Sequence, residues 1–386
     1  MARLLLVSLL CLLVLIGGAT HLLAQTPEAQ AAPILADAEI LLSQGDAASA
    51  QASLETLIAT YPLASCVWEA RVRLSECYAK QERFDDAITT AQTVINNYPL
   101  EAPQVWAAWA QYHIGVGYYG KQDAGSALSE LARVSDVLGS HSDRSPLMAA
   151  KCKTALIQHV LNNRDAAIAI TQEVLADPNA GPADKASASV RLGASLIGNR
   201  KVAEGLAILN GVRTQYPTVQ VQLKDAERHI FDKQYIGSHD YDGAISFGNS
   251  IMSDSAAIPE RARQAGYFVC LAHLYKKDYS NTITAAESLL TRFQEPASDR
   301  RQWLMMKARA QARTNDYQGA IATLESVLAT NPTDVEFNAT VEWDLATCHR
   351  ALGHKYLARK KYMRLTEFFQ LSHLADRART ELKIYK

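Results

Sequence analysis

The chain has 386 residues, of which 48% are hydrophobic and 20% are charged, which is typical of a folded protein rather than a disordered one. Its formal net charge is -1, so the charge balance excludes a strongly basic nucleic-acid-binding protein, and we expect no nucleic-acid partner. The charge is unevenly spread: residues 1–298 carry 24 Lys and Arg against 30 Asp and Glu, whereas residues 299–386 carry 15 against 10. A basic C-terminal end suits either an acidic partner or a solvated helix face.

Residues 1–24 have the pattern of a secretory signal peptide. Arg3 precedes an apolar run over 4–16, and small residues follow the run before Ala24. The run is shorter than the roughly 20 apolar residues that a membrane-spanning helix needs. We therefore predict an exported, bacterial protein that is periplasmic or extracellular, with an uncleaved segment that anchors the chain in the membrane as the alternative. The next residues, 25–33, are predicted to form a flexible leader.

Five widely spaced cysteines follow the signal segment, and no two of them form a C-x-x-C pair. Four fall in predicted first helices, where cysteine behaves as a small buried hydrophobic residue. We therefore predict that they are core residues and that they bind no metal. The five are Cys66, Cys77, Cys152, Cys270 and Cys348.

A short motif recurs along the chain and consists of an aromatic residue, two polar or small residues, a small residue and an isoleucine. It is clearest at 317–321 (YQGAI), 84–88 (FDDAI) and 241–245 (YDGAI). Nine copies of its small residue lie 37 to 40 residues apart, and such a period predicts stacked structural units. The nine are Ala50, Ala87, Ala127, Ala167, Gly205, Ala244, Thr282, Ala320 and Ala358.

Each unit is predicted to be a helix hairpin. In the second unit, apolar residues at helical spacing mark a first helix over 69–78 and a second helix from Ala87 that ends before Pro99. The small residue lets the second helix approach the first closely. After the ninth unit, 371–386 has one more apolar face, made by Leu371, Leu374, Ala375, Ala378 and Leu382. This segment is predicted to be a terminal capping helix, with a docking helix for another protein as the alternative.

This pattern resembles the tetratricopeptide repeat (TPR) family. Gly115, Tyr118, Ala127 and Leu131 of the third unit match the family pattern. The resemblance covers about 31–370, and we assign 34–370 to the array. The period averages near 38 residues rather than about 34, which is similar to long-period bacterial envelope members such as the barrel-assembly lipoprotein and the TolA-binding protein. The resemblance implies an all-α, right-handed superhelical solenoid of about nine hairpins.

The sixth and seventh units depart from the family pattern, because Asp232 and Cys270 occupy the position of a small residue in the first helix. No metal-ligand, nucleophile-elbow or phosphate-loop motif is present in the sequence, so we expect neither enzyme activity nor a cofactor. The run 237–240 (GSHD) contains Ser, His and Asp, but adjacent residues cannot assemble as a catalytic triad. A turn is predicted there.

The resemblance also implies that a protein or peptide segment binds in a concave groove lined by first-helix side chains. Aromatic residues would supply apolar area, and arginines would supply paired donors for carboxylates. For the aromatic residues, the alternative is a place in the core between repeats. The groove residues in this register are Trp109, Tyr112, Tyr119, His159, His229, Lys233, Tyr267, Arg309, Arg313, Trp343 and Arg350.

The sequence therefore predicts an exported scaffold of the cell envelope that binds other proteins. One alternative is a carbohydrate-active or peptidoglycan-associated factor, which would show carboxylate pairs facing Trp109 or Tyr112. Another is an anchored assembly subunit whose N-terminal segment stays uncleaved, the one case in which a membrane would be a partner. The identity of the partner and the oligomeric state stay open.

Overall fold

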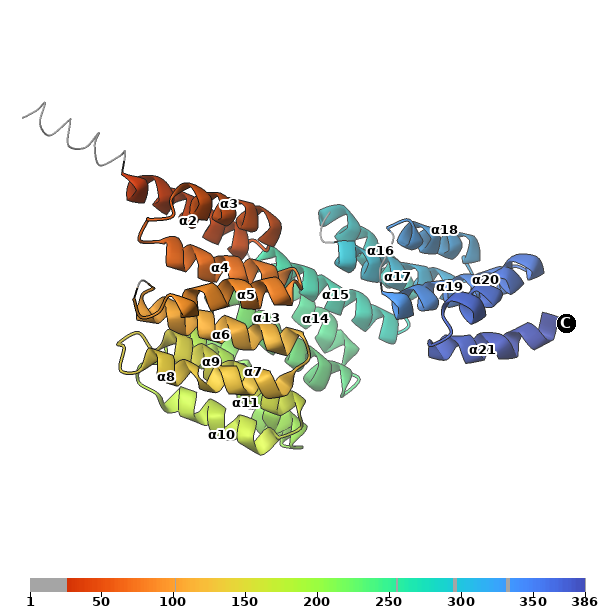
Figure 1. Cartoon of the computed structure of the whole chain (residues 1–386). Helices are drawn as coiled ribbons and strands as arrows, with labels where there is room; N and C mark the ends of the chain where they lie inside the picture. The colour runs from red at the N-terminus through yellow and green to blue at the C-terminus, as the bar shows by residue number, and fades with distance from the viewer. Residues whose placement is uncertain (1–25, 101, 255, 294–296, 331–333, 386) are drawn as a thin grey trace, which may run out of the picture. The chain divides into compact units, whose positions relative to one another are not determined.

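The computed structural model describes residues 26–100, 102–254, 256–293, 297–330 and 334–385 (Figure 1). The predicted signal peptide, 1–24, lies outside these residues. Within the described ranges the chain forms helices and no strand, and none of these helices is long and apolar enough to cross a bilayer. The chain divides into two compact units, 1–208 and 209–386.

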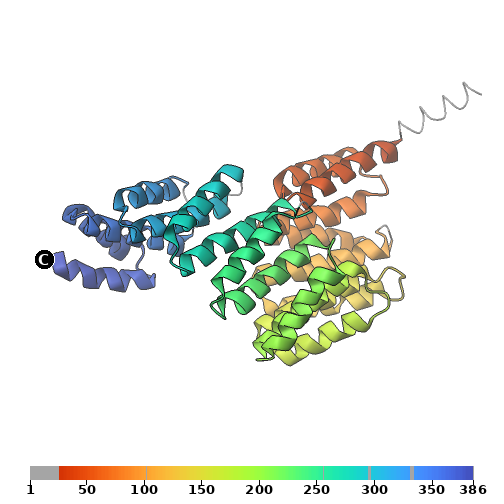
Figure 2. The ribbon, with the colours of Figure 1, turned by 180° about the vertical axis from the view of Figure 1, so that it is seen from behind.

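In the first unit, consecutive helices pack side by side as antiparallel pairs (Figure 2). The second helix of the third pair is divided at Arg133 into α7 and α8. The helices are α2 (Pro27–Ser43), α3 (Ala47–Thr60), α4 (Val67–Lys80), α5 (Phe84–Asn96), α6 (Gln104–Gly120), α7 (Ala124–Ala132), α8 (Val134–Leu138), α9 (Ser145–Val160), α10 (Arg164–Ala176) and α11 (Pro182–Gly198). Helix α12 (Val202–Gln215) crosses the boundary between the units.

The second unit repeats this arrangement, with one first helix that continues into a π-helix, η1. Its elements are α13 (Gln220–Ile230), η1 (Phe231–Ile236), α14 (Tyr241–Met252), α15 (Pro259–Tyr275), α16 (Tyr279–Arg292), α17 (Ala297–Arg313), α18 (Tyr317–Leu328), α19 (Val335–Ala351), α20 (Lys355–Phe368), α21 (His373–Leu382) and the short 3-10 helix η2 (Lys383–Tyr385). The predicted all-α solenoid of helix hairpins is thus confirmed.

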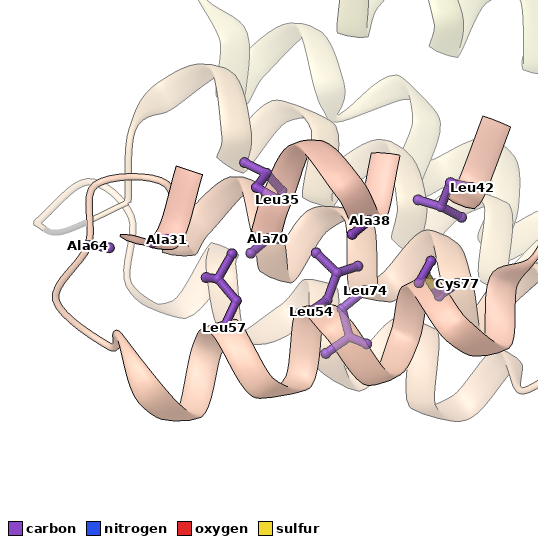
Figure 3. Close-up of a cluster of buried hydrophobic side chains, with 11 residues drawn as sticks. Ala31, Leu35, Ala38, Leu42, Leu54, Leu57, Ala64, Ala70, Leu74 and Cys77 are labelled. Atoms are coloured by element: carbon purple, nitrogen blue, oxygen red, sulfur yellow. The ribbon is translucent and has the colours of Figure 1, made fainter. Parts of the chain in front are cut away.

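The core forms wherever three successive helices meet, as the first hairpin shows (Figure 3). Ala31, Leu35, Ala38 and Leu42 recur at intervals of three or four residues, so they share one face of α2. That face packs on buried residues of α3 and α4, among them Leu54. A hairpin alone would leave such a face in water, and stacking on the next hairpin buries it.

The predicted leader, 25–33, is wrong from Pro27 onward, because α2 begins there. Thr26 caps the helix by accepting a hydrogen bond from the Ala29 amide, and Pro27 occupies the first turn, where its missing N–H costs nothing. Ala31 is already fully buried. Pro33, the last residue of the predicted leader, lies inside α2 between alanine and isoleucine.

Each of the nine predicted small residues is the fourth residue of a second helix and is buried. Gly205 shows how close the approach is, because a Cβ atom on it would lie 2.6 Å from the carbonyl oxygen of Gly193 and 2.6 Å from Ile197 Cγ1. The motif therefore sets the spacing between the paired helices.

The bend before each second helix has one geometry that the sequence did not reveal. The residue five positions before each small residue has a left-handed backbone conformation. The amide of the residue after it donates a hydrogen bond to a carbonyl of the first helix, as the Asp46 amide does to the Leu41 carbonyl. These bonds define a Schellman motif, which satisfies the last carbonyls of a helix. Two of the left-handed residues, Gly45 and Gly353, are glycine. The others are Glu82, Gln122, Asn162, Arg200, His239, Lys277 and Asn315.

The run 237–240 belongs to one of these bends. His239 is its left-handed residue, and the Asp240 carboxylate accepts a hydrogen bond of 2.9 Å from the Gly243 amide at the start of α14. The Asp240 carboxylate, one of the three side chains needed for a triad, thus has a structural role.

The segment 371–386 contains α21, whose Leu374 and Ala378 are buried against α19 and α20. Leu371 precedes the helix and is fully exposed, so it does not belong to the apolar face that we assigned to it. The five cysteines are free thiols, and all are buried except Cys66, which is half-buried.

Candidate partner-binding surface of the first helices

The first helices carry their own series of small buried residues, twelve positions before those of the second helices. Asp232 is the exception, and it is exposed. The residues at this position are Ala38, Ser75, Gly115, Ala155, Gly193, Asp232, Cys270, Ala308 and Ala346. An unpaired carboxylate is costly to bury, so this repeat needs a different local structure.

That different structure is the π-helix η1. A π turn holds more residues than an α turn, so it shifts the helix face that points to the core. Phe231 is fully buried, and its ring stacks on Phe268 of α15 with centroids 4.1 Å apart. The extra residue, Asp232, turns outward, where burial of its surroundings raises the pKa of the carboxyl and Arg228 and Lys233 partly oppose that rise.

A hollow of about 660 Å³ lies beside this turn, on α13, η1, α15 and α17, and we name it the π-turn hollow. Ion pairs join its successive first helices. Lys224 Nζ lies 3.1 Å from Glu260 Oε2, and Arg263 Nε lies 2.9 Å from Asp299 Oδ2. The lining residues are Lys224, Arg228, Asp232, Glu260, Arg263, Gln264, Tyr267, Phe268, Leu271, Asp299, Gln302 and Trp303.

A second hollow, of about 700 Å³, lies along α15, α17 and α19 at their C-terminal halves, and we name it the tyrosine hollow. Tyr275, Tyr279 and Tyr317 line it, the last two as the first residues of α16 and α18. The full lining is Leu274, Tyr275, Lys277, Tyr279, Ala308, Arg309, Ala312, Arg313, Tyr317, Leu324, Asp344, Thr347 and Cys348.

Positive charge is in excess in the tyrosine hollow. Arg309 Nε lies 3.1 Å from Asp344 Oδ2, and desolvation raises the pKa of Asp344 although Arg309 and Arg313 oppose it. Arg313 and Lys277 make no ion pair with any residue in the described ranges. Two cations without an ion-pair partner among the described residues therefore line the hollow together with Tyr275, Tyr279 and Tyr317.

The structure brings three of the predicted groove residues to these hollows: Tyr267 lines the π-turn hollow, and Arg309 and Arg313 line the tyrosine hollow. Arg350 instead pairs with Glu381 of α21. Trp343 packs in the core of the last hairpin, where the Arg377 guanidinium lies 4.4 Å from its ring centroid.

The predicted aromatic residues of the third unit are half-buried and pack on core clusters. Trp109 and Tyr112 form an edge-to-face pair with centroids 5.5 Å apart, and burial raises the pKa of Tyr112. Tyr119 joins the same cluster as Tyr112. This placement favours the alternative of a core between repeats for these three residues. Their contacts offer nothing that favours a glycan cleft.

The remaining predicted residues are separate from both hollows. His159 Nδ1 lies 3.1 Å from Ser195 Oγ, and burial lowers the pKa of this histidine. His229 is half-buried on α13, and Lys233 is exposed on η1. Among the residues that the structure describes, no three His, Cys, Asp or Glu side chains gather as a metal site.

Sequence reasoning missed the tyrosines of the second helices and Lys277. The signal was present, because Tyr279 and Tyr317 are the aromatic residues of the recurring motif, but we interpreted them only as packing residues of the bend. Lys277 is the left-handed residue of its bend. To predict that it lines the hollow, the geometry of the bend would also have been needed.

A series of helix hairpins whose first helices carry hollowed surfaces defines a scaffold for protein–protein interaction. Family models of the tetratricopeptide repeat match two segments, residues 41–112 and residues 271–335. The chain thus contains tetratricopeptide repeats in these two segments. No curated protein matches it.

Several solved structures resemble the chain at low sequence identity. The apo form of RapI is 11% identical with a TM-score of 0.51, over 88% of this chain and 87% of that chain, and this likeness shows the fold alone. A tetratricopeptide repeat protein from Parabacteroides merdae is 10% identical with a TM-score of 0.37, over 82% of this chain and 98% of that one. The Cut9–Hcn1 hetero-tetramer of the APC/C is 13% identical with a TM-score of 0.35, over 85% and 79%.

Proposed function

We propose that the chain is an exported scaffold of the cell envelope that holds a segment of another protein along the first helices of residues 209–386. The observation that carries the proposal is the excess of positive charge in the tyrosine hollow, which Lys277 and Arg313 line together with three tyrosines. An acidic side chain of the partner would accept hydrogen bonds from these two cations. The rings would cover the adjoining apolar part of the segment at a low cost in conformational entropy.

The pattern of Arg3 and the apolar run 4–16 supports export, and the long repeat period supports the resemblance to envelope members of the family. Cell fractionation and determination of the N-terminal residue of the mature chain test this part. We expect a chain that starts after Ala24 or Ala19. An intact Met1 in a membrane fraction would instead support the anchored alternative.

Site-specific photo-crosslinking in the host tests the surface. A photoreactive residue is placed at Arg313, in the tyrosine hollow, and at Ser326, an exposed residue of α18 that does not line it. We expect a defined crosslinked product at Arg313 and none at Ser326. Lys277→Glu in the same chain should abolish the product.

Equal products at both positions, or a product at Arg313 that Lys277→Glu leaves unchanged, would contradict the proposal. Identification of the captured partner then provides a direct check, because its crosslinked segment should contain an acidic residue.

A further inference from the structure

The outer face of α20 differs from the outer faces of the second helices before it. In α14, α16 and α18 the second, sixth and ninth residues are small, polar or acidic, and all are exposed. In α20 the same positions hold a large aromatic residue, a cation and a long apolar residue, also exposed. The sets are Asp242, Ser246 and Asn249; Ser280, Thr284 and Glu287; Gln318, Ala322 and Glu325; and Tyr356, Lys360 and Met363.

The face of α20 is both apolar and basic. Tyr356 is 76% exposed and Phe368 is 71% exposed, with Met363 between them, and the three border a furrow of about 650 Å³. Arg359 and Lys360 line the furrow and make no ion pair with the described residues. Exposed apolar side chains that cluster beside unpaired cations are typical of an interaction surface.

The outer face of α2, in the first hairpin, has small apolar residues and an acidic residue where the face of α20 has large apolar residues and basic ones. This face of α2 exposes Ala29, Ala32, Pro33 and Ala36, with Ile40 53% exposed. Asp37 lies on the same face. Residues 26–70 contain six carboxylates and neither Lys nor Arg, whereas 355–386 contains nine Lys and Arg against three carboxylates.

The first and the last α-helix of the described residues, α2 and α21, differ in how they meet solvent. A terminal helix of a repeat array needs a polar outer face to stay soluble. Helix α21 has one, with Asp376, Arg377 and Arg379 exposed. Helix α2 presents mainly small apolar residues instead, which leaves it suited to a further layer.

We propose that the outer face of α20 in one copy of the chain docks on the outer face of α2 in a second copy. The large side chains of α20 would pack on the small residues of α2, and the cations beside them would face the acidic first hairpin. Because the two faces are different, the contact is heterologous. A joined pair therefore keeps one free α2 face and one free α20 face, and further copies join head to tail.

A contact between two single helices buries less surface than a standard interface of about 800 Å² on each partner. The association should therefore be weak and concentration-dependent. Its electrostatic part acts between exposed groups, so salt should weaken it. The proposal uses none of the residues in the π-turn or tyrosine hollow, so it can fail while the proposed function stands, and the reverse.

Sedimentation velocity on the full chain over a range of concentrations is the first test. We expect species larger than a dimer at high protein concentration and low salt, and at least a tenfold weaker association, about 1.4 kcal/mol, at high salt. Two variants then separate the faces. The α2 variant carries Asp37→Lys and Ile40→Lys. The α20 variant carries Tyr356→Ser, Lys360→Ser and Met363→Asn, and each new residue occurs at the same position of another second helix.

Each variant alone should be monomeric, because one of its two faces is lost. An equimolar mixture should form a dimer and nothing larger, because only one intact pair of faces remains. A control with Ala322→Ser and Glu325→Asn on α18 should associate like the parent chain, and thermal melting should show that all variants fold.

A parent chain that is monomeric at every concentration would overturn the proposal, even if it floats with anionic phosphatidylglycerol vesicles or binds an acidic partner through α20. An α2 variant that still forms dimers would also overturn it, because α20 would then pair with itself.

Discussion

The ring of Phe231 stacks on the ring of Phe268 because the π turn places Phe231, rather than Asp232, toward the core. One residue that cannot be buried thus changes the local helix type, and the turn that accommodates it borders a hollow on the first-helix surface. A departure from the repeat and a feature of the candidate site coincide here.

Asp232 should contribute little to stability. Because its side chain is exposed, Asp232→Ala should change the free energy of unfolding by no more than about 0.5 kcal/mol. Ala308 holds the equivalent position in α17 and is buried, so Ala308→Asp should cost about 3 kcal/mol or more through an unpaired buried carboxylate. Urea unfolding of the two variants measures the contrast, and equal losses would contradict this account of the π turn.

Ala320 should tolerate no larger residue, because it is fully buried at the fourth position of α18. Ala320→Leu should destabilise the protein by about 1–3 kcal/mol through overpacking. The matched control is Ala322→Leu, two residues later on the exposed face, which should change stability by about 0.5 kcal/mol at most. A melting curve of Ala320→Leu that matches the parent chain would show that the register of this hairpin is wrong.

The bends should respond to glycine in a predictable direction. Gln122 is exposed and has φ 64, a conformation that costs a residue with a Cβ atom about 1 kcal/mol. Gln122→Gly should therefore raise the free energy of unfolding by a few tenths of a kcal/mol to about 1 kcal/mol. Gly45, with φ 88, offers the reverse test, since Gly45→Ala should lower it by a similar amount. Thermal unfolding measures both, and shifts of the same sign would not fit.

His113 should make stability depend on pH. Burial lowers its pKa to about 4, below the ordinary value of 6.5 that applies in the unfolded chain. As the pH falls from 6.5 to 4, the unfolded chain binds a proton that the folded chain does not, so this histidine lowers stability by up to about 3 kcal/mol.

Urea unfolding at a series of pH values measures this effect. His113→Phe should flatten the decline between pH 6.5 and 4 relative to the parent chain. Parallel curves for the parent chain and His113→Phe would contradict the buried, neutral state of His113.

Tyr112 and Arg313 should separate packing from binding. Tyr112 packs beside Trp109, so Tyr112→Ala should cost about 3 kcal/mol as a truncation of a large core side chain. Arg313 is exposed, so Arg313→Glu should leave the melting temperature nearly unchanged but reduce capture of the partner at least tenfold. Melting curves and quantified crosslinking give the two readouts. If Tyr112→Ala instead left the melting temperature unchanged and reduced capture of the partner, Tyr112 would be a groove residue.

The sequence was sufficient for the hairpins, because each depends on short-range patterns. The small residue, the apolar spacing and the proline that follows lie within about forty residues of one another. Pro99 follows the end of α5, and Pro178 follows the end of α10. Pro332 lies outside the described residues.

The candidate site was harder to predict because it depends on how neighbouring hairpins meet. Arg309 was identified from its register, but its pairing with Asp344, 35 residues later, follows from the packing of α17 on α19. The aromatic residues of α6 had the right spacing for a groove, yet they pack on core clusters that α6 shares with neighbouring helices. Asp232 was the one sign of the π turn in the sequence. It shows that a carboxylate stands where the other repeats bury a small residue, but not that a π turn accommodates it.

The Schellman bends restrict where the length of a repeat can vary. The equivalent position of the first helix always lies twelve residues before the small residue of the second helix, so the variation of the repeat between 37 and 40 residues falls elsewhere in the unit. The connections from one hairpin to the next absorb it, and exposed side chains such as Leu63 and Leu100 lie there. Epitope tags and fluorescent reporters are therefore best inserted at these connections, where added chain leaves the paired helices in register.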